Sequence, residues 1–305
     1  LTSYSFGQQF YEGFNYTSPG NIGGATTTTT DAVGSNNWLT QSNTSGSAGT
    51  IDVLSGNLSY PGIATSTGNK VFLAGSNSTV PRDINRGFTM PSASTVLYYS
   101  VLLNIVDNTQ LVASPIATGN TNSYFMSFGS TSGTNVNTLN GRLAAATVNS
   151  GANYRLQINN NSSGSTSNYT EFPLDLSFGT TYLAVVKVDI TTSPYVVSLW
   201  VNPSSLGGAE PSGAVTNNSG TNSTTTTFGS IVLRNASATP KVEIDEIKVG
   251  LTYADVTSST LSSASFSQID GLKMYPNPVK GGNLHIETAL NGDVNVAIFD
   301  LVGKQ

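Results

Sequence analysis

The sequence has no cysteine and a single histidine, His285, among its 305 residues. Without cysteine the chain can form neither disulfides nor thiolate metal sites, and it has no thiol nucleophile. Because His285 stands near the end of the sequence, the residues before it can supply neither a Ser-His-Asp triad nor a histidine-ligated metal site. Stability must therefore come from packing, and any bound metal must be held by oxygen ligands.

Charge is scarce as well, because Asp, Glu, Lys and Arg make up 10% of the residues and the formal net charge is -5. A chain with this balance has no basic stripe to neutralise phosphates, which argues against nucleic acid as a partner. It contains no run of about 18 apolar residues, so no transmembrane segment is expected. The sequence opens at Leu1 without a basic and apolar leader, and we expect a mature form whose signal peptide has been removed.

Apolar residues that alternate with Ser, Thr, Asn or Gly recur along most of the chain. This period of two is typical of half-buried strands, and no helical period competes with it. The pattern predicts an all-β, two-sheet jelly-roll sandwich. Strands are expected at residues 95–107, 124–128, 142–148, 154–158, 183–190, 195–201, 231–234 and 241–250, with a hairpin joining 183–190 to 195–201 and long loops at 25–35, 159–168 and 207–228.

Alternation is lost over residues 257–271, which are small and polar as in a flexible linker. The sequence therefore predicts a jelly-roll domain over residues 1–256, a linker over 257–271 and a separate segment over 272–305.

Four segments of the first domain resemble, in their order, the concanavalin A-like, laminin-G-like jelly roll of many bacterial surface proteins. They are Phe-Tyr-Glu-Gly-Phe-Asn-Tyr at 10–16, Gly-Asn-Leu-Ser-Tyr-Pro-Gly at 56–62, Leu-Trp-Val-Asn-Pro at 199–203 and Ile-Asp-Glu-Ile-Lys-Val-Gly at 244–250. The resemblance implies a domain that binds glycans or mediates adhesion, or one that cleaves glycans.

The segment after the linker resembles the type A C-terminal sorting domain of Bacteroidetes proteins exported by the type IX secretion system. Tyr275, Pro276, Asn277 and Pro278 carry the motif, and strand-like residues 284–286 and 294–300 follow it. The resemblance implies a small β-sandwich, of which 272–305 is the beginning, and delivery through the periplasm and outer membrane to the cell surface or medium. Its partners would be the translocon and an outer-membrane shuttle protein.

Sugar recognition needs flat apolar faces for stacking and amide or charged groups for hydroxyls. Several residues opposite apolar strand positions meet this need and could line an open sheet face. They are Trp200, Tyr98, Asn104, Arg142, Arg155 and Gln157. The alternative for Trp200 and Tyr98 is packing beneath a loop.

The acidic segment 242–247 invites comparison with the Glu-x-Asp-x-Glu pattern of glucanase-type jelly rolls. Glu243 and Asp245 share a strand face, but Ile247 stands at the third position and Glu246 projects to the opposite side. No catalytic residue is therefore assigned. Catalysis of the lyase kind by Tyr154, Arg155, Arg142 and Tyr98 has no recognisable spacing.

Similar jelly rolls often hold calcium near their termini. The resemblance thus suggests one structural Ca²⁺, with Glu12 and Asp245 as its carboxylate ligands. The sequence as a whole favours a secreted or cell-surface protein that binds glycans or mediates adhesion. A glycan-cleaving lyase or hydrolase, and a structural surface protein captured as cargo by the secretion translocon, are the alternatives.

Overall fold

The computed structural model describes most of the first domain and two short pieces of the tail. The described residues are 8–23, 38–42, 51–64, 66, 68–75, 82–91, 94–120, 123–136, 138–161, 168–220, 227–236, 238–258, 273–275 and 285–287. Contacts divide the chain into two compact units, one of residues 7–262 and one of residues 1–6 with 263–305. The predicted loop at 25–35 and nearly all of the predicted linker lie outside the described residues.

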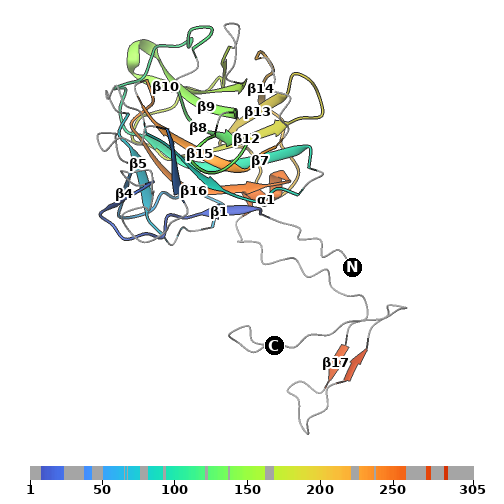
Figure 1. Ribbon diagram of the computed structural model, residues 1–305. Coiled ribbons are helices and arrows are strands. Elements are labelled where there is room, and N and C mark those ends of the chain that lie inside the picture. The colour runs from blue at the N-terminus through green and yellow to red at the C-terminus, as the bar shows by residue number, and fades with distance from the viewer. Residues whose placement is uncertain are drawn as a thin grey trace. The chain divides into compact units, whose positions relative to one another are not determined.

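The first unit is a sandwich of two antiparallel sheets, as predicted (Figure 1). Sheet A has nine strands among the described residues. Their spatial order is β14 (Val215–Asn217), β13 (Val196–Val201), β12 (Tyr182–Asp189), β7 (Val96–Ile105), β16 (Val242–Gly250), β5 (Lys70–Leu73), β4 (Ile51–Leu54) and β2 (Gly20–Ile22), with β1 (Phe10–Glu12) pairing with β16 beside this path.

Sheet B has seven strands among the described residues. Their order is β11 (Thr170–Glu171), β10 (Asn153–Asn161), β9 (Leu139–Val148), β8 (Tyr124–Gly129), β15 (Ser230–Asn235), β6 (Arg82–Gly87) and β3 (Trp38–Ser42). β9 and β10 form a hairpin whose turn is Asn149–Gly151. β12 and β13 pair as the predicted hairpin.

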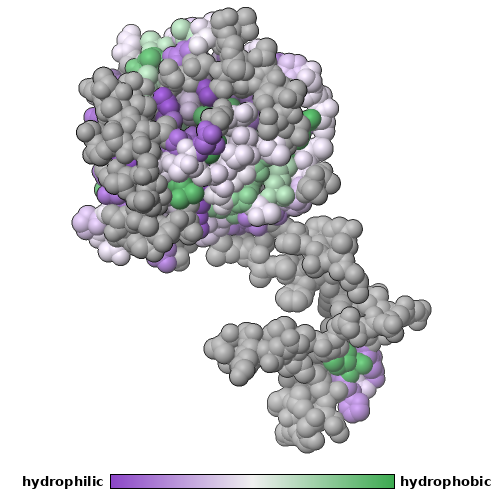
Figure 2. Space-filling model, in the orientation of Figure 1, coloured by the Kyte–Doolittle hydropathy of each residue, from purple (hydrophilic) through white to green (hydrophobic). Residues whose placement is uncertain are grey.

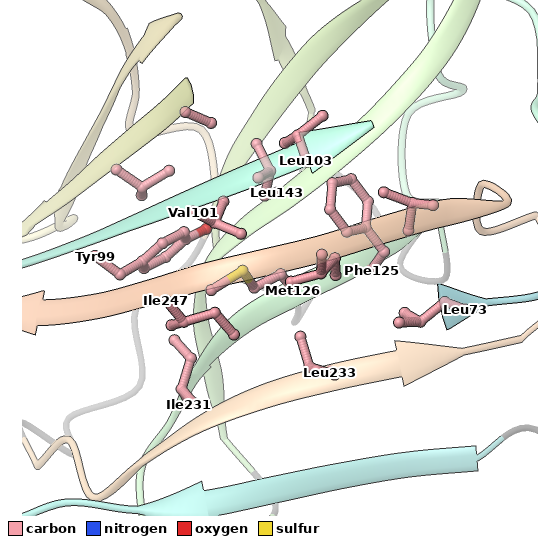
Figure 3. Close-up of a cluster of buried hydrophobic side chains, with 14 of the residues drawn as sticks. Leu73, Tyr99, Val101, Leu103, Phe125, Met126, Leu143, Ile231, Leu233 and Ile247 are labelled. Atoms are coloured by element: carbon pink, nitrogen blue, oxygen red, sulfur yellow. The ribbon is translucent and has the colours of Figure 1, made fainter. Parts of the chain in front are cut away.

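The main core lies between the two sheets and follows the alternation of the sequence. Tyr99, Val101 and Leu103 of β7 face Phe125 and Met126 of β8 across the sandwich (Figure 3). The intervening residues of β7 point to the other side of sheet A, where a second apolar cluster forms. The eight predicted strands are all confirmed, with ends that differ by at most three residues.

The structure differs from the predicted secondary structure in several short elements. β10 continues to Asn161 and β14 occupies residues 215–217, both inside stretches predicted as loops. A short helix, α1 (Tyr253–Thr257), closes the domain and was not predicted. Its N-cap Thr252 and Asp255 form a capping box, a signal that is present in the sequence but is followed by too few residues to show a helical period. The strands β1 to β6 and β11 were not predicted from the sequence either.

The surface of the sandwich is polar but weakly charged. Figure 2 shows one face, on which hydrophobic residues form only small patches. In the described part of the sandwich, Val106 and Leu174 are the large hydrophobic residues with exposed side chains. No helix of the described residues is long and apolar enough to cross a membrane.

The second unit contains one antiparallel hairpin among its described residues, made of β17 (Lys273–Tyr275) and β18 (His285–Glu287). The rings of Tyr275 and His285 stack with centroids 5.4 Å apart. Pro276, Asn277 and Pro278, which are predicted to belong to a sorting motif, lie outside the described residues.

Two buried asparagines join the sheets where β10 approaches β14. Asn160 of sheet B donates to the carbonyl oxygens of Tyr195 (3.0 Å) and Gly220 (3.4 Å), and its own oxygen accepts from the Gly220 N–H (2.8 Å). Asn217 of sheet A accepts from the Asn160 N–H at 3.0 Å. These bonds satisfy backbone groups that would otherwise be buried without partners.

We predict that Asn160→Ala lowers the free energy of unfolding by about 1–3 kcal/mol, because it leaves buried backbone groups unsatisfied. Chemical denaturation would measure the change. The matched control is Asn218→Ala, which removes an exposed side chain and should change stability by less than about 0.5 kcal/mol. Equal effects of the two variants would contradict the assigned role of Asn160.

Candidate functional site

The six residues predicted for glycan contact do not share one face. Trp200 and Tyr98 lie on the outer side of sheet A, where they are 4% and 5% exposed. Trp200 Nε1 donates to the Pro211 carbonyl (2.9 Å), and the Tyr98 hydroxyl bonds Glu210. Both rings thus pack beneath the loop that follows β13, in the second apolar cluster.

Asn104 lies on the same side of sheet A, in a polar group with two charged residues. Its Nδ2 donates to Glu243 Oε2 at 2.9 Å, and Lys70 Nζ lies 2.7 Å from Glu243 Oε1. The carboxylate of Glu243 is therefore already neutralised and hydrogen-bonded.

Arg142 lies on the outer side of sheet B in a buried cluster. Its guanidinium lies 4.1 Å from the centroid of the Tyr124 ring, and Arg234, which pairs with Asp83 at 2.6 Å, lies 5.3 Å from the same ring. Burial lowers the pKa of Arg142. At 5% exposure, its side chain offers little surface to a large ligand.

Arg155 and Gln157 lie on β10, next to the edge strand β11 of sheet B. Arg155 pairs with Glu171 (2.7 Å) and Asp175 (2.5 Å), and Gln157 donates to Glu171 and to Ser114 at 3.1 Å each. Alternation fixes the face of a residue within its own sheet, but it does not say to which sheet a strand belongs. Alternation therefore could not show that the six residues predicted for glycan contact divide between the outer faces of the two sheets. Tyr154, a candidate for lyase chemistry, is fully buried in the main core.

Glu12 and Asp245 do not fit a calcium site. Oε1 of Glu12 accepts from the Phe14 N–H (2.8 Å), and Oε2 accepts from the Tyr16 hydroxyl (2.7 Å), from Trp38 Nε1 (2.9 Å) and from Arg86. Four donors, one of them cationic, thus occupy this carboxylate in place of a metal ion.

Asp245 lies away from Glu12, on the outer side of sheet A. Its carboxylate accepts from the backbone N–H groups of Leu58 (2.9 Å) and Glu246 (2.8 Å), and so fastens the 55–64 segment to β16. Burial raises the pKa of Asp245 to about 7, and these two N–H groups lower it in part.

A β-bulge between Asp245 and Lys248 changes the direction of Glu246. Glu246 has a left-handed backbone with φ of 51°, which is costly for a residue other than glycine. Its Oε1 accepts from the Tyr11 hydroxyl at 2.6 Å. Bulges often redirect a side chain beside a functional site.

Tyr11 lines a cavity that combines aromatic and polar groups. This cavity, named the Tyr11 cavity, has a volume of about 350 Å³. It is lined by Tyr11, Glu12, Gly13, Asn15, Tyr16, Gly68 and Arg86. Burial and the hydrogen bond to Glu246 raise the pKa of Tyr11, so its hydroxyl stays protonated.

Two glycines shape the Tyr11 cavity. A Cβ on Gly68 would lie 1.7 Å from the Gly13 carbonyl oxygen, so the two backbone segments can approach only without a side chain there. A Cβ on Gly13 would lie 2.5 Å from the Tyr11 hydroxyl. Glycine at position 13 therefore leaves space directly beside that hydroxyl.

The sequence contains a signal for this cavity in the segment that also supplies the fold motif and the predicted calcium ligand Glu12. Residues 10–16 place tyrosine, glutamate, asparagine and glycine close together, and glycine beside aromatics often marks a close approach of the backbone to a ligand or to another segment. Arg86 could not be assigned from sequence, because its strand carried no recognised pattern.

The Tyr11 cavity offers tyrosine rings, an exposed carboxamide on Asn15 and a guanidinium that is already paired. Among the lining residues the charges of Glu12 and Arg86 cancel, and Glu246 behind Tyr11 interacts electrostatically with Lys248. Such a lining suits an uncharged ligand with many hydroxyl groups.

No protein-family model matches the sequence, and no curated protein matches it. Among solved structures, the chain is similar to an endo-β-1,4-glucuronan lyase from Trichoderma reesei, with 11% identity, a TM-score of 0.43, and coverage of 82% of this chain and 98% of the lyase. An endo-1,3-β-glucanase from Streptomyces sioyaensis has 13% identity, a TM-score of 0.38, and coverage of 82% and 97%. The lumenal domain of VIP36, bound to Ca²⁺ and mannose, has 8% identity, a TM-score of 0.36, and coverage of 85% and 92%. At these values the likenesses say nothing of ligand or activity.

The raised pKa of Asp245 predicts a pH dependence of stability. Between about pH 4 and pH 7 the folded protein keeps a proton on Asp245 that the unfolded chain has released. The contribution of Asp245 to the free energy of unfolding is therefore complete below pH 4 and is lost as pH rises through 7. The free energy of unfolding falls by up to about 1.4 kcal/mol per pH unit over this range. Asp245→Asn should remove this slope.

Urea denaturation of the wild type and the variant across that pH range would measure the difference. Asp52→Asn on the neighbouring part of sheet A controls for the loss of one carboxylate. Identical pH profiles of the wild type and Asp245→Asn would show that Asp245 does not retain its proton in the fold.

Proposed function

We propose that the protein is a secreted or cell-surface carbohydrate-binding protein whose jelly-roll domain holds a neutral polysaccharide in the Tyr11 cavity. The observation that carries the proposal is the lining of this cavity, in which the half-buried Tyr11 ring lies beside amide, carboxylate and guanidinium groups. Aromatic rings stack on the C–H faces of sugars, and the polar groups bond their hydroxyls. Adhesion to a glycan-coated surface would follow from such binding.

The bonding of Glu12 supports binding by a rigid site. Phe14 has a left-handed backbone with φ of 50°, and the Tyr16 N–H donates to its carbonyl at 2.7 Å, which makes a tight turn. Glu12 holds this turn through the Phe14 N–H and the Tyr16 hydroxyl. A lining fixed before the ligand arrives loses little conformational entropy on binding.

We predict that Asn15→Ala and Tyr11→Ala each weaken binding to a neutral polysaccharide by about tenfold, which equals about 1.4 kcal/mol. Affinity electrophoresis of the full chain in gels with glucan, mannan or galactan would measure it. Asn218→Ala and Tyr275→Ala are the matched controls, because they remove an exposed asparagine and an exposed tyrosine elsewhere.

Undiminished binding in both cavity variants would refute the Tyr11 cavity as the site. Release of soluble oligosaccharides by the wild type would favour the glycan-cleaving alternative. Absence of binding to every neutral polysaccharide would favour a structural role.

The export route is a separate part of the proposal. We infer from the motif at Tyr275 to Pro278 that residues 272–305 belong to a type A sorting domain. The translocon and the shuttle protein of the type IX secretion system are then the partners of this tail. The expected route passes through the periplasm and outer membrane.

Removal of the chain from residue 272 onward should leave the protein in the periplasm of its host, because the sorting signal is then lost. Cell fractionation and surface proteolysis would locate it. Replacement of the same residues by the sorting domain of another exported protein should restore delivery. Normal surface delivery of the truncated chain would refute the export route.

A further inference from the structure

A second cavity lies at the tip of the β9–β10 hairpin, apart from the Tyr11 cavity. We call it the hairpin cavity, and its volume is about 440 Å³. It is lined by Asn108, Leu111, Ala113, Ser114, Thr147, Val148, Asn149, Ser150 and Gly151. None of these residues lines the Tyr11 cavity.

The two walls of the hairpin cavity are fixed to each other. Segment 112–114 runs beside the end of β9, where the Thr147 N–H donates to the Val112 carbonyl (2.9 Å) and the Ser114 N–H donates to the Thr147 carbonyl (2.8 Å). Asn108 Nδ2 donates to the Gly151 carbonyl at 3.0 Å and closes the cavity from the other side. The cavity is thus preformed.

A polar network orients the turn that forms one wall. Asn149 Nδ2 donates to Asp175 Oδ2 (2.8 Å), and Asp175 in turn pairs with Arg155. Because Asn108 and Asn149 both donate through their nitrogens, the carboxamide oxygen of each is left as an acceptor. Asn108, Asn149 and Ser150 are exposed to solvent.

The turn adopts a backbone that is costly for its sequence. Asn149, Ser150 and Gly151 have φ values of 51°, 56° and 88°, all left-handed. Glycine would adopt this conformation without penalty, yet two of the three positions carry polar side chains. Strained residues of this kind are frequent at binding sites, and here they present an amide and a hydroxyl to the cavity.

The charges around the hairpin cavity indicate whether its ligand is charged or uncharged. Arg155 pairs with both Glu171 and Asp175, so the surroundings carry an excess of one negative charge. Amides and hydroxyls line the cavity, Leu111 and Val148 add apolar surface, and none of its described lining residues is charged. These groups suit the hydroxyls and C–H groups of an uncharged sugar and disfavour anions.

We propose that the hairpin cavity is a second saccharide-binding site, which takes an uncharged sugar unit and allows one chain to bridge two glycan segments. This inference goes beyond the proposed function, since it concerns another site, and it makes a monomer bivalent. Two linked sites raise the retention on a polymer far above that of either site alone.

The test uses the full chain and beads coated with glucan, mannan or galactan, with polyuronate beads as the charged comparison. The variant Asn149→Gly with Ser150→Gly removes both polar side chains at positions where glycine suits the backbone, so the fold is retained. Asn202→Gly, at a left-handed asparagine with φ of 47° after β13, is the matched control. Bead agglutination and single-bead retention are both measured.

We expect the wild type and Asn202→Gly to agglutinate one kind of neutral bead. The double variant should still coat those beads but fail to agglutinate them, with retention reduced at least tenfold. Agglutination and retention by the double variant equal to those of the wild type would overturn the inference, as would failure of the wild type to bind any neutral bead. If Tyr11→Ala binds normally while the double variant does not bind, the hairpin cavity stands as a saccharide site, whereas the Tyr11 cavity, and with it the bridging of two glycan segments, is refuted.

Discussion

One buried carboxylate, Glu12, organises the end of the sandwich on which the Tyr11 cavity depends. It belongs to β1 of sheet A, yet its oxygens accept from Trp38 of β3 and Arg86 of β6, which belong to sheet B. Removing one partner from a buried, hydrogen-bonded charge pair costs about 3–5 kcal/mol. The same carboxylate fixes the turn at Phe14, so the cavity lining and the joining of the sheets have a common cause.

The long strands could be predicted because each shows its alternation over several residues. β7 places apolar side chains on one face throughout its ten residues, and β9 directs Leu143 and Ala145 into the main core. β1 and β2 have three residues each and β11 has two, which is too short for a period to appear. Their formation depends on pairing with strands far away in sequence, which a local pattern cannot show.

The candidate sites were harder to predict than the fold for two physical reasons. Strand alternation could not tell that Trp200 and Arg142 belong to different sheets, nor that both side chains are buried on the outer faces of those sheets. The bulge in β16 also broke the regular alternation, so Glu246 reached Tyr11 instead of following the pattern of its neighbours. Both effects arise from tertiary packing.

Backbone strain gives the two cavities a common feature. Among the described residues, seven other than glycine have a left-handed backbone. Phe14 and Glu246 hold the Tyr11 cavity, and Asn149 and Ser150 form a wall of the hairpin cavity. A packed sandwich can offset about 1–2 kcal/mol at each such residue. The side chains at these positions make contacts that glycine would lose: Phe14 stacks on Trp38 in the core, Glu246 accepts from the Tyr11 hydroxyl, and Asn149 donates to Asp175.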